Sequence, residues 1–270
     1  MSWLDAIILG LVEGITEYLP ISSTGHLILA RSLLGLQAGE VNSTLIIIQG
    51  AAILAVCWEY RARLWDTALA VRSQQGARRF VLNLLLAFLP LAVLGLMFGG
   101  PLKAVLFAPV PVALALVIGG VLILWAERRK HTERIAAVDD IQPLDAIKVG
   151  LLQALALIPG TSRSAATILG GLIIGMSRRA ATEFSFFIAI PALLAATAYE
   201  LWQTRGSFEL RHFGPIALSC IIAFVSALLS IRFLLRFVSR HSFAVFAWYR
   251  IVFGTIVLIT AYTGLVVWAR

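Results

Sequence analysis

The sequence predicts an all-α polytopic membrane protein, an inverted-topology repeat in which each half is a re-entrant helical hairpin plus three transmembrane helices. Three observations predict it: an apolar composition, six uncharged runs, and two broken apolar regions that resemble each other. Of the 270 residues, 60% are hydrophobic and 13% are charged, whereas soluble domains carry about 25% charged residues. The mean hydropathy is +0.92. These values exclude a disordered chain, a coiled coil and an ordinary soluble enzyme.

Six stretches carry no charged residue and approach or reach the ~20 apolar residues that a spanning helix needs. They are Val41–Trp58, Phe80–Leu102, Val105–Ala126, Phe184–Tyr199, Phe213–Ile231 and Ile251–Ala269. The run at 184–199 is the shortest and must extend through Leu201 and Trp202 to cross a bilayer. We therefore expect six transmembrane helices.

Two further apolar regions, Trp3–Leu36 and Leu144–Gly175, are interrupted near their middles. The interruptions are Leu19–Gly25 and Ile158–Ser164. A proline disfavours helix at the residue before it, and Ser or Thr caps the helix that follows. Helix, break and helix, with arms too short to span, is the pattern of a re-entrant hairpin.

The two broken regions resemble each other at an offset of 140 residues. Matching pairs are Ala6-Ile7 and Ala146-Ile147, Gly10-Leu11 and Gly150-Leu151, Ser22 and Ser162, and Gly35 and Gly175. We predict one membrane domain over 1–270, with a first inverted repeat at 1–126 and a second at 144–270.

The net charge of +8 comes from basic residues in short loops between the apolar runs, which is unlike a nucleic-acid-binding surface. An odd number of crossings per repeat puts the two copies in opposite orientations, and the basic loops then divide between the two sides of the membrane. One side holds Arg61, Arg63, Arg72, Arg78, Arg79, Arg128, Arg129, Lys130, Arg134, Arg178, Arg179, Arg236 and Arg240. The other holds Arg31, Lys103, Arg205, Arg211 and Arg270. The positive-inside rule makes the first side cytoplasmic, so the first hairpin enters from outside and both termini are external.

Tips of opposed hairpins should meet near the bilayer midplane. Glu13 and Glu17 are four residues apart, so their carboxylates share a helix face. Two carboxylates in a low dielectric favour a bound divalent ion or a proton shuttle, against the alternative of a solvated helix face. We predict both as metal ligands.

Hydroxyl side chains gather at the two predicted tips: Ser22, Ser23, Thr24, Ser162, Ser164 and Thr167. Free N–H groups and the helix dipole at a helix N-terminus favour an anion, and the forked cation of Arg163 suits phosphate. Plain N-capping is the alternative. His26, one turn after Ser22, is a candidate general acid or base. Gln49, Gln153 and Glu183 are further polar residues near the tips.

The motifs resemble those of the undecaprenyl-diphosphatases, also called the bacitracin-resistance family. Residues 11–26, LVEGITEYLPISSTGH, are similar to its first signature, and residues 159–167, PGTSRSAAT, are similar to its Pro-Gly-x-Ser-Arg-Ser-x-x-Thr signature. The resemblance implies hydrolysis of undecaprenyl diphosphate to the carrier lipid for peptidoglycan, bacitracin resistance, a site open to the outer face of the bacterial cytoplasmic (inner) membrane, and a divalent cation.

The residues and the resemblance lead to one hypothesis. Arg163 and the hydroxyls bind the diphosphate, Glu13 and Glu17 hold Mg²⁺ or Ca²⁺, and the attacking group is Ser23 activated by His26, or a water activated by His26 or Glu17. The alternative function is a lipid-phosphate transporter or flippase, because inverted repeats with broken helices are typical of transporters. We expect membrane lipids and a polyprenyl diphosphate as partners and no nucleic acid. The sequence leaves the oligomeric state open, including a homodimer.

Overall fold

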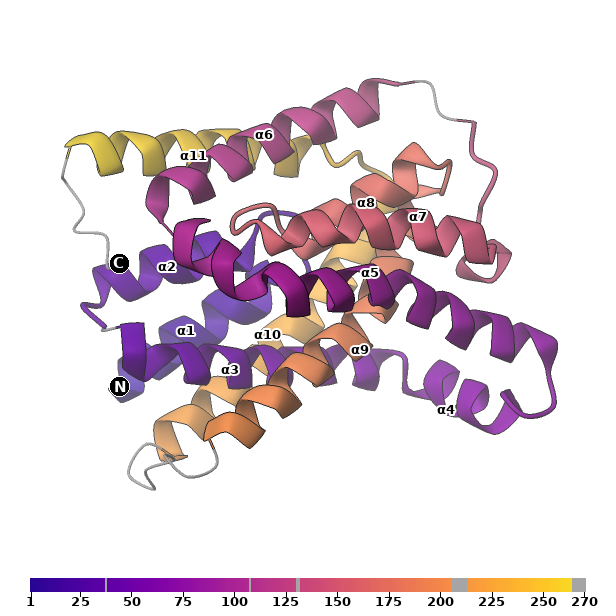
Figure 1. The fold of residues 1–270 in the computed structure, drawn as a ribbon, viewed down its shortest axis with the longest axis horizontal. Coiled ribbons are helices and arrows are strands. Elements are labelled where there is room, and N and C mark those ends of the chain that lie inside the picture. The colour runs from indigo at the N-terminus through magenta and orange to yellow at the C-terminus, as the bar shows by residue number, and fades with distance from the viewer. Residues whose placement is uncertain (37, 107, 130–131, 205–212, 264–270) are drawn as a thin grey trace.

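The structure is a computed structural model that describes residues 1–36, 38–106, 108–129, 132–204 and 213–263. Within these ranges nearly all regular structure is helical (Figure 1). The α-helices are α1 Trp3–Thr16, α2 Ser23–Leu33, α3 Ala38–Glu59, α4 Arg61–Ala70, α5 Gln75–Leu106, α6 Pro109–Arg128, α7 Pro143–Gln153, α8 Arg163–Ile173, α9 Arg178–Thr204, α10 Phe213–Val238 and α11 Ala244–Thr263. Two short 3₁₀ turns are η1 Val138–Asp140 and η2 Ala154–Leu157.

The predicted class, an all-α polytopic membrane protein, is confirmed. Five helices in the described residues are long and apolar enough to cross a membrane, namely α5, α6, α9, α10 and α11. A sixth candidate span is the pair of α3 and α4, which meets the length and composition criteria only when the two helices, bent by 75° against each other, are taken together. Five of the six predicted runs each lie in one helix as far as the described residues extend, the last continuing past Thr263. The run Val105–Ala126 instead starts at the end of α5 and continues in α6. Lys130, Arg205, Arg211 and Arg270, and the side chain of Lys103, lie outside the described residues.

Two elements differ from the sequence-based expectation. The helix α4 falls in a segment where we predicted only a loop. Helix α9 starts six residues before the predicted run, at Arg178. Its charged first turn is tolerated because Arg178 pairs with Glu127 and Arg179 pairs with Glu183. Charges that neutralise one another at a helix end remain compatible with a spanning helix.

Each hairpin packs on a helix from the other half of the chain. Helix α1 lies on α10, and α7 lies on α5. Glycines permit both contacts: a Cβ on Gly14 would lie 2.1 Å from Ser226 Oγ, and one on Gly150 would lie 2.5 Å from the Ala87 carbonyl oxygen. Small residues allow such close approach between helices in membranes. The arrangement fits the predicted repeats at 1–126 and 144–270, which stay a prediction.

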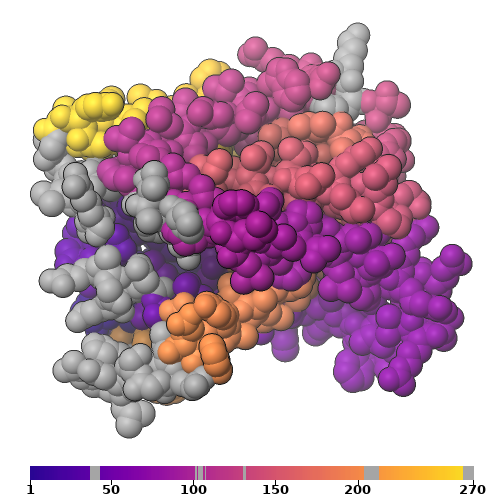
Figure 2. All heavy atoms as spheres, viewed as in Figure 1, coloured from indigo at the N-terminus to yellow at the C-terminus, as the bar shows by residue number. Residues whose placement is uncertain are grey.

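The loops predicted to be cytoplasmic lie together at one end of the molecule. Ion pairs join them across long stretches of sequence: Arg63 to Asp139, Arg178 to Glu127, and Arg232 to Glu59. Helix α4 and the turn into α5 occupy this end, opposite α2 and the N-terminus (Figures 1 and 2). The predicted segregation of charge therefore has a structural counterpart in these contacts.

Candidate active site

Both hairpin tips turn at a serine with an unusual backbone conformation. Ser22 precedes α2 with a φ of 73°, and Ser162 precedes α8 with a φ of 70°. Positive φ is uncommon for residues other than glycine, and such strained residues persist where the surrounding structure holds them, often at functional sites. The two serines predicted to correspond therefore adopt the same local geometry.

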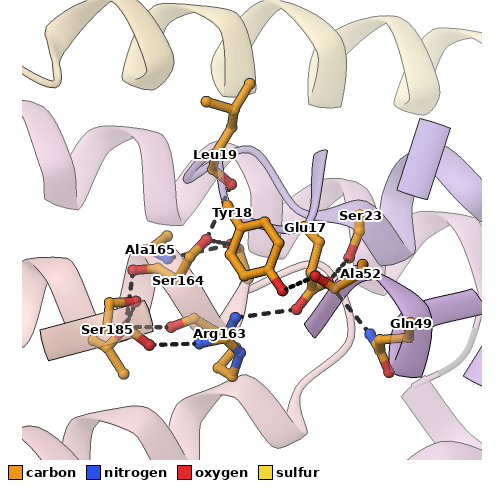
Figure 3. Close-up of polar contacts among 12 residues, drawn as sticks. Glu17, Tyr18, Leu19, Ser23, Gln49, Ala52, Arg163, Ser164, Ala165 and Ser185 are labelled. Atoms are coloured by element: carbon orange, nitrogen blue, oxygen red, sulfur yellow. Dashed lines mark hydrogen bonds and ion pairs between the residues drawn. The ribbon is translucent and has the colours of Figure 1, made fainter. Parts of the chain in front are cut away.

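The two tips touch each other. Glu17 Oε1 lies 3.1 Å from Arg163 Nη2, and Ser164 Oγ donates to the Leu19 carbonyl oxygen at 3.0 Å (Figure 3). The side chains of Glu17 and Arg163 are only 5% and 10% exposed. An ion pair shielded from water in this way resists screening by salt, so it can fix one tip against the other.

Besides Arg163 of the second tip, Glu17 contacts two further polar side chains, those of Ser23 and Gln49 (Figure 3). Its Oε2 accepts a hydrogen bond of 2.6 Å from Ser23 Oγ and one of 3.3 Å from Gln49 Nε2. One carboxylate therefore faces both a cation and a hydroxyl. A carboxylate bonded to a hydroxyl in this way can act as a general base toward it.

Arg163 is held in place by the second tip and by α9. Its Nη1 donates to the Ser185 carbonyl oxygen at 3.0 Å. Thr167 Oγ1, which is buried, lies 2.6 Å from Ser185 Oγ and donates to the Arg163 carbonyl oxygen at 2.9 Å. Thr167 thus supports the segment that carries the guanidinium.

A cavity of about 150 Å³ opens between the tips, lined by Glu17, Ser22, Ser23, Thr24, Gln49, Ala156, Gly160, Ser162, Arg163 and Leu193. Two buried donors belong to its lining residues and have no hydrogen-bond partner among the described residues, Ser22 Oγ and Arg163 Nε. A buried donor without a partner costs free energy. A ligand with several oxygen acceptors would satisfy both.

Four of the predicted site residues lie outside the lining of this cavity: Glu13, His26, Ser164 and Thr167. His26 Nδ1 is 2.7 Å from the Ser22 carbonyl oxygen, and its Nε2 is 2.7 Å from the Tyr249 hydroxyl. Because a carbonyl only accepts, the proton belongs on Nδ1 and Nε2 accepts from Tyr249. The side chain hydrogen-bonded to the Ser23 hydroxyl is Glu17, whereas the sequence suggested His26 as its partner.

Glu13 has an environment that fits a cation. It is fully buried, and neither carboxylate oxygen has a hydrogen-bond partner in the described ranges. Glu13 lies in the last turn of α1, and Glu17, paired with Arg163, directly follows the end of that helix. Mg²⁺ binds through one or two carboxylates and keeps waters or substrate phosphates as its other ligands. The described residues contain no group of three or more His, Cys, Asp or Glu side chains that could hold a metal.

Comparison with known proteins decides the family. The family described as "Bacitracin resistance protein BacA" matches residues 6–256. The chain belongs to this family.

Members of the bacitracin-resistance family resemble this chain over its whole length. A protein of Nitrosospira multiformis named "Undecaprenyl-diphosphatase" is 58% identical, covering 100% of both chains. "Undecaprenyl-diphosphatase 2" of Rhodospirillum rubrum is 57% identical, covering 98% of this chain and 97% of its own. A Dechloromonas aromatica protein named "Undecaprenyl-diphosphatase" is 56% identical with the same coverage.

Within this bacitracin-resistance fold, sequence reasoning missed Arg250 and Tyr249 of α11 and gave no role to Ser185. Arg250 is the largest fully buried side chain among the described residues and bonds to both tips. The only sequence signal was a charged residue between two apolar segments, at 243–249 and from 251 onward. Gln49, named as a polar residue near the tips, does contact Glu17, and Gln153 bonds the Ala87 carbonyl oxygen as a helix-packing contact.

Proposed function

We propose that this chain hydrolyses undecaprenyl diphosphate to undecaprenyl phosphate and phosphate. The observation that carries the proposal is the Glu17–Arg163 contact, which puts a carboxylate and a guanidinium at one buried cavity with two unsatisfied donors. Family membership and the names of its relatives support the same reaction. The reaction returns the carrier lipid to peptidoglycan synthesis and removes the diphosphate form that bacitracin traps.

In this proposal the polyprenyl tail stays in the lipid and the diphosphate enters the cavity. Arg163 Nε and Ser22 Oγ donate to phosphate oxygens. Thr24 and Ser162 line the same cavity. Fixed donors aimed at developing charge lower the barrier because they need no reorganisation during the reaction. Ser164 and Thr167 hold the second tip in position by bonding Leu19 and the backbone of α8.

The attack begins at Glu17. Its Oε2 takes the proton of Ser23, whose Oγ is 2.6 Å away, or the proton of a water that occupies the cavity. In the first route Ser23 Oγ bonds to the terminal phosphorus and undecaprenyl phosphate leaves; water then releases phosphate from the serine. In the second route water attacks directly. His26 orients the Ser22 backbone through its Nδ1.

The divalent cation belongs to the proposal as well. Glu13 and Glu17 would hold it, and when bound it would offset negative charge on the diphosphate. The support is the buried carboxylate of Glu13, whose two oxygens have no hydrogen-bond partner among the described residues.

We place the protein in the cytoplasmic (inner) membrane of a bacterium, with the cavity open to the external side. The support is the charge distribution: the arginine-rich loops gather at the end that carries α4, as the positive-inside rule requires for a cytoplasmic face. Ser22, which lines the cavity, belongs to the hairpin that enters from the opposite end.

Phosphate release tests the proposal. Purified protein in detergent, supplied with undecaprenyl diphosphate and Mg²⁺, should release inorganic phosphate, and Glu17→Ala should abolish that release while folding normally. Binding of the lipid without turnover would instead support a carrier. A phosphoserine trapped at Ser23 would establish the covalent route, and substantial turnover by Ser23→Ala would establish attack by water.

A further inference from the structure

Arg250 of α11 is a fully buried arginine, with 0% of its surface exposed, in the middle of an apolar helix. A buried guanidinium is costly unless its donors are satisfied. In the described part of the chain, the acceptors of Arg250 are all main-chain carbonyl oxygens. Nη1 donates to Pro20, Nε to Leu116, and Nη2 to Ala115, Gly160 and Thr161.

These carbonyls come from three separate segments. Pro20 belongs to the first hairpin tip, Gly160 and Thr161 belong to the second, and Ala115 and Leu116 belong to α6. At 3.0–3.2 Å, the bonds to the two tips have ordinary lengths. One side chain therefore ties both tips to each other and to the neighbouring spanning helix.

A break in a helix leaves carbonyl oxygens without their usual intrahelical partners. In a membrane, such groups must be satisfied by the protein itself. The guanidinium supplies five donors in a fixed plane, which suits a cluster of carbonyls converging from two breaks. Lysine offers three donors from a single point and cannot span the same set of segments.

The bonded carbonyls adjoin the residues that line the cavity. Thr161 immediately precedes Ser162, and Pro20 lies two residues before Ser22, so Arg250 contacts both turns that carry the positive-φ serines. Gly160 itself lines the cavity. Because the Glu17–Arg163 pair joins the same two tips, any relative shift of the tips would change its length.

We infer that Arg250 is a positioning residue for the proposed diphosphatase reaction, holding the two hairpin tips in register so that Glu17 and Ser23 of one face Arg163 of the other. It acts through the backbone. The inference rests on the proposed function, and it adds a role for a residue outside both signature motifs.

Gly119 of α6 offers an independent way to displace this guanidinium. A Cβ at Gly119 would lie 2.3 Å from Arg250 Nη2, so Gly119→Ala pushes the guanidinium away while retaining the arginine. Gly76, near the start of α5, is the matched control because a Cβ there would meet no described atom within 4 Å.

The experiment measures kcat and KM for phosphate release from undecaprenyl diphosphate with wild type, Arg250→Met, Arg250→Lys, Gly119→Ala and Gly76→Ala. Arg250→Met should lower kcat/KM at least 100-fold and raise KM several-fold, because the phosphate donors no longer converge. Gly119→Ala should also raise KM. The kcat and KM of Arg250→Lys should lie between those of wild type and Arg250→Met, and those of Gly76→Ala should match wild type. A smaller folded fraction lowers the apparent kcat and leaves KM unchanged.

A double variant separates an effect through Arg250 from general damage. Gly119→Ala combined with Arg250→Met should be no worse than Arg250→Met alone, since the displaced group is already absent. Three results would each overturn the inference. The losses of the two single variants could multiply in the double variant, KM could stay unchanged in Arg250→Met and Gly119→Ala, or the rate of Arg250→Met could lie within threefold of wild type. If Arg250→Met does not fold, Arg250→Lys and Gly119→Ala decide by the same KM criterion.

Hydrogen exchange provides a readout that does not depend on turnover. The amides of residues 19, 21–23 and 160–164 should exchange faster together in Gly119→Ala than in Gly76→Ala. Equal exchange in the two variants contradicts the positioning role. An inactive wild type with this exchange pattern would refute the diphosphatase proposal while leaving the coupling of the tips intact.

Discussion

The two hairpin tips share a backbone turn but differ in the chemistry they bring to the cavity. The first contributes Glu17 and Ser23, and the second contributes Arg163 at the position that corresponds to Ser23. Two tips with the same backbone turn thus present an acid and a hydroxyl from one side and a cation from the other. Two identical tips would bring like charges together, which would repel in a low dielectric.

The corresponding serines also differ in what their hydroxyls do. Ser162 Oγ accepts from the Ala165 amide at 3.2 Å and caps α8. Ser22 makes no such side-chain cap on α2, and its Oγ lacks a partner in the described part of the chain. One serine stabilises its helix and the other retains a free donor for a ligand.

Among the variants that compare the two tips, the largest effect should come from removing the cation of the second tip. Arg163→Ala should lower kcat/KM by about 10²–10³ because one fixed donor to the transition state is lost. Phosphate release from purified protein measures it. Arg163→Lys is the control, since an ammonium cannot reproduce the forked contact to Glu17 and Ser185. Turnover equal to wild type in Arg163→Lys would contradict the forked geometry.

The next variant replaces an acid of the first hairpin by the amide found at the corresponding position of the second. Glu13 corresponds to Gln153, so Glu13→Gln should raise the Mg²⁺ concentration required for half-maximal rate by about tenfold or more. A titration of phosphate release against free Mg²⁺ after treatment with a chelator measures the shift. Glu183→Gln, which removes a partner of Arg179 at the far end of α9, should leave the titration unchanged. An identical curve for Glu13→Gln would refute its role as a ligand.

The two serines should separate into a stability effect and a binding effect. Ser162→Ala should lower the free energy of unfolding by about 1 kcal/mol because an N-cap is lost. Ser22→Ala should leave stability nearly unchanged and raise KM about 2–10-fold, the value of one net hydrogen bond. Thermal unfolding in detergent and steady-state kinetics measure the two. Equal unfolding shifts in both variants would show that the hydroxyls are equivalent.

The smallest effect should lie at the end of the molecule that carries α4, far from both tips. Hydrogen bonds from Arg63, together with its charge, hold the pKa of the Asp139 carboxyl below its ordinary value. The pair is partly exposed, so it should contribute under about 1 kcal/mol. That contribution is present above the ordinary pKa of aspartate, about 3.9, and disappears as the pH falls through the lower folded-state pKa.

Asp139→Asn measures this contribution. At neutral pH the variant should unfold at a slightly lower temperature than wild type, and the difference should vanish in acid once Asp139 is protonated. Its rate of phosphate release should equal that of wild type. A change in rate would mean that this end communicates with the cavity.

Much of the architecture was open to prediction because a membrane imposes simple rules on sequence. Uncharged runs of sufficient length must be helices that span, and the breaks at Pro20 and Pro159 within shorter apolar regions predict re-entrant turns. Spacing alone placed Glu13 and Glu17 on one face. By contrast, α4 was not predicted. Its mixture of arginine, tryptophan and leucine contains no uncharged run long enough to span a membrane, and it lies between two such runs, where we expected a loop.

The amino-acid sequence by itself determined the class, the two tips and the kinds of side chain that meet between them, since these follow from local hydropathy and helix-breaking residues. Only the tertiary structure decided that Glu17 reaches Ser23 and that His26 turns to Tyr249. It alone brought Arg250 to Pro20, which is 230 positions away. Such partners depend on how distant helices pack, and local sequence carries no record of that.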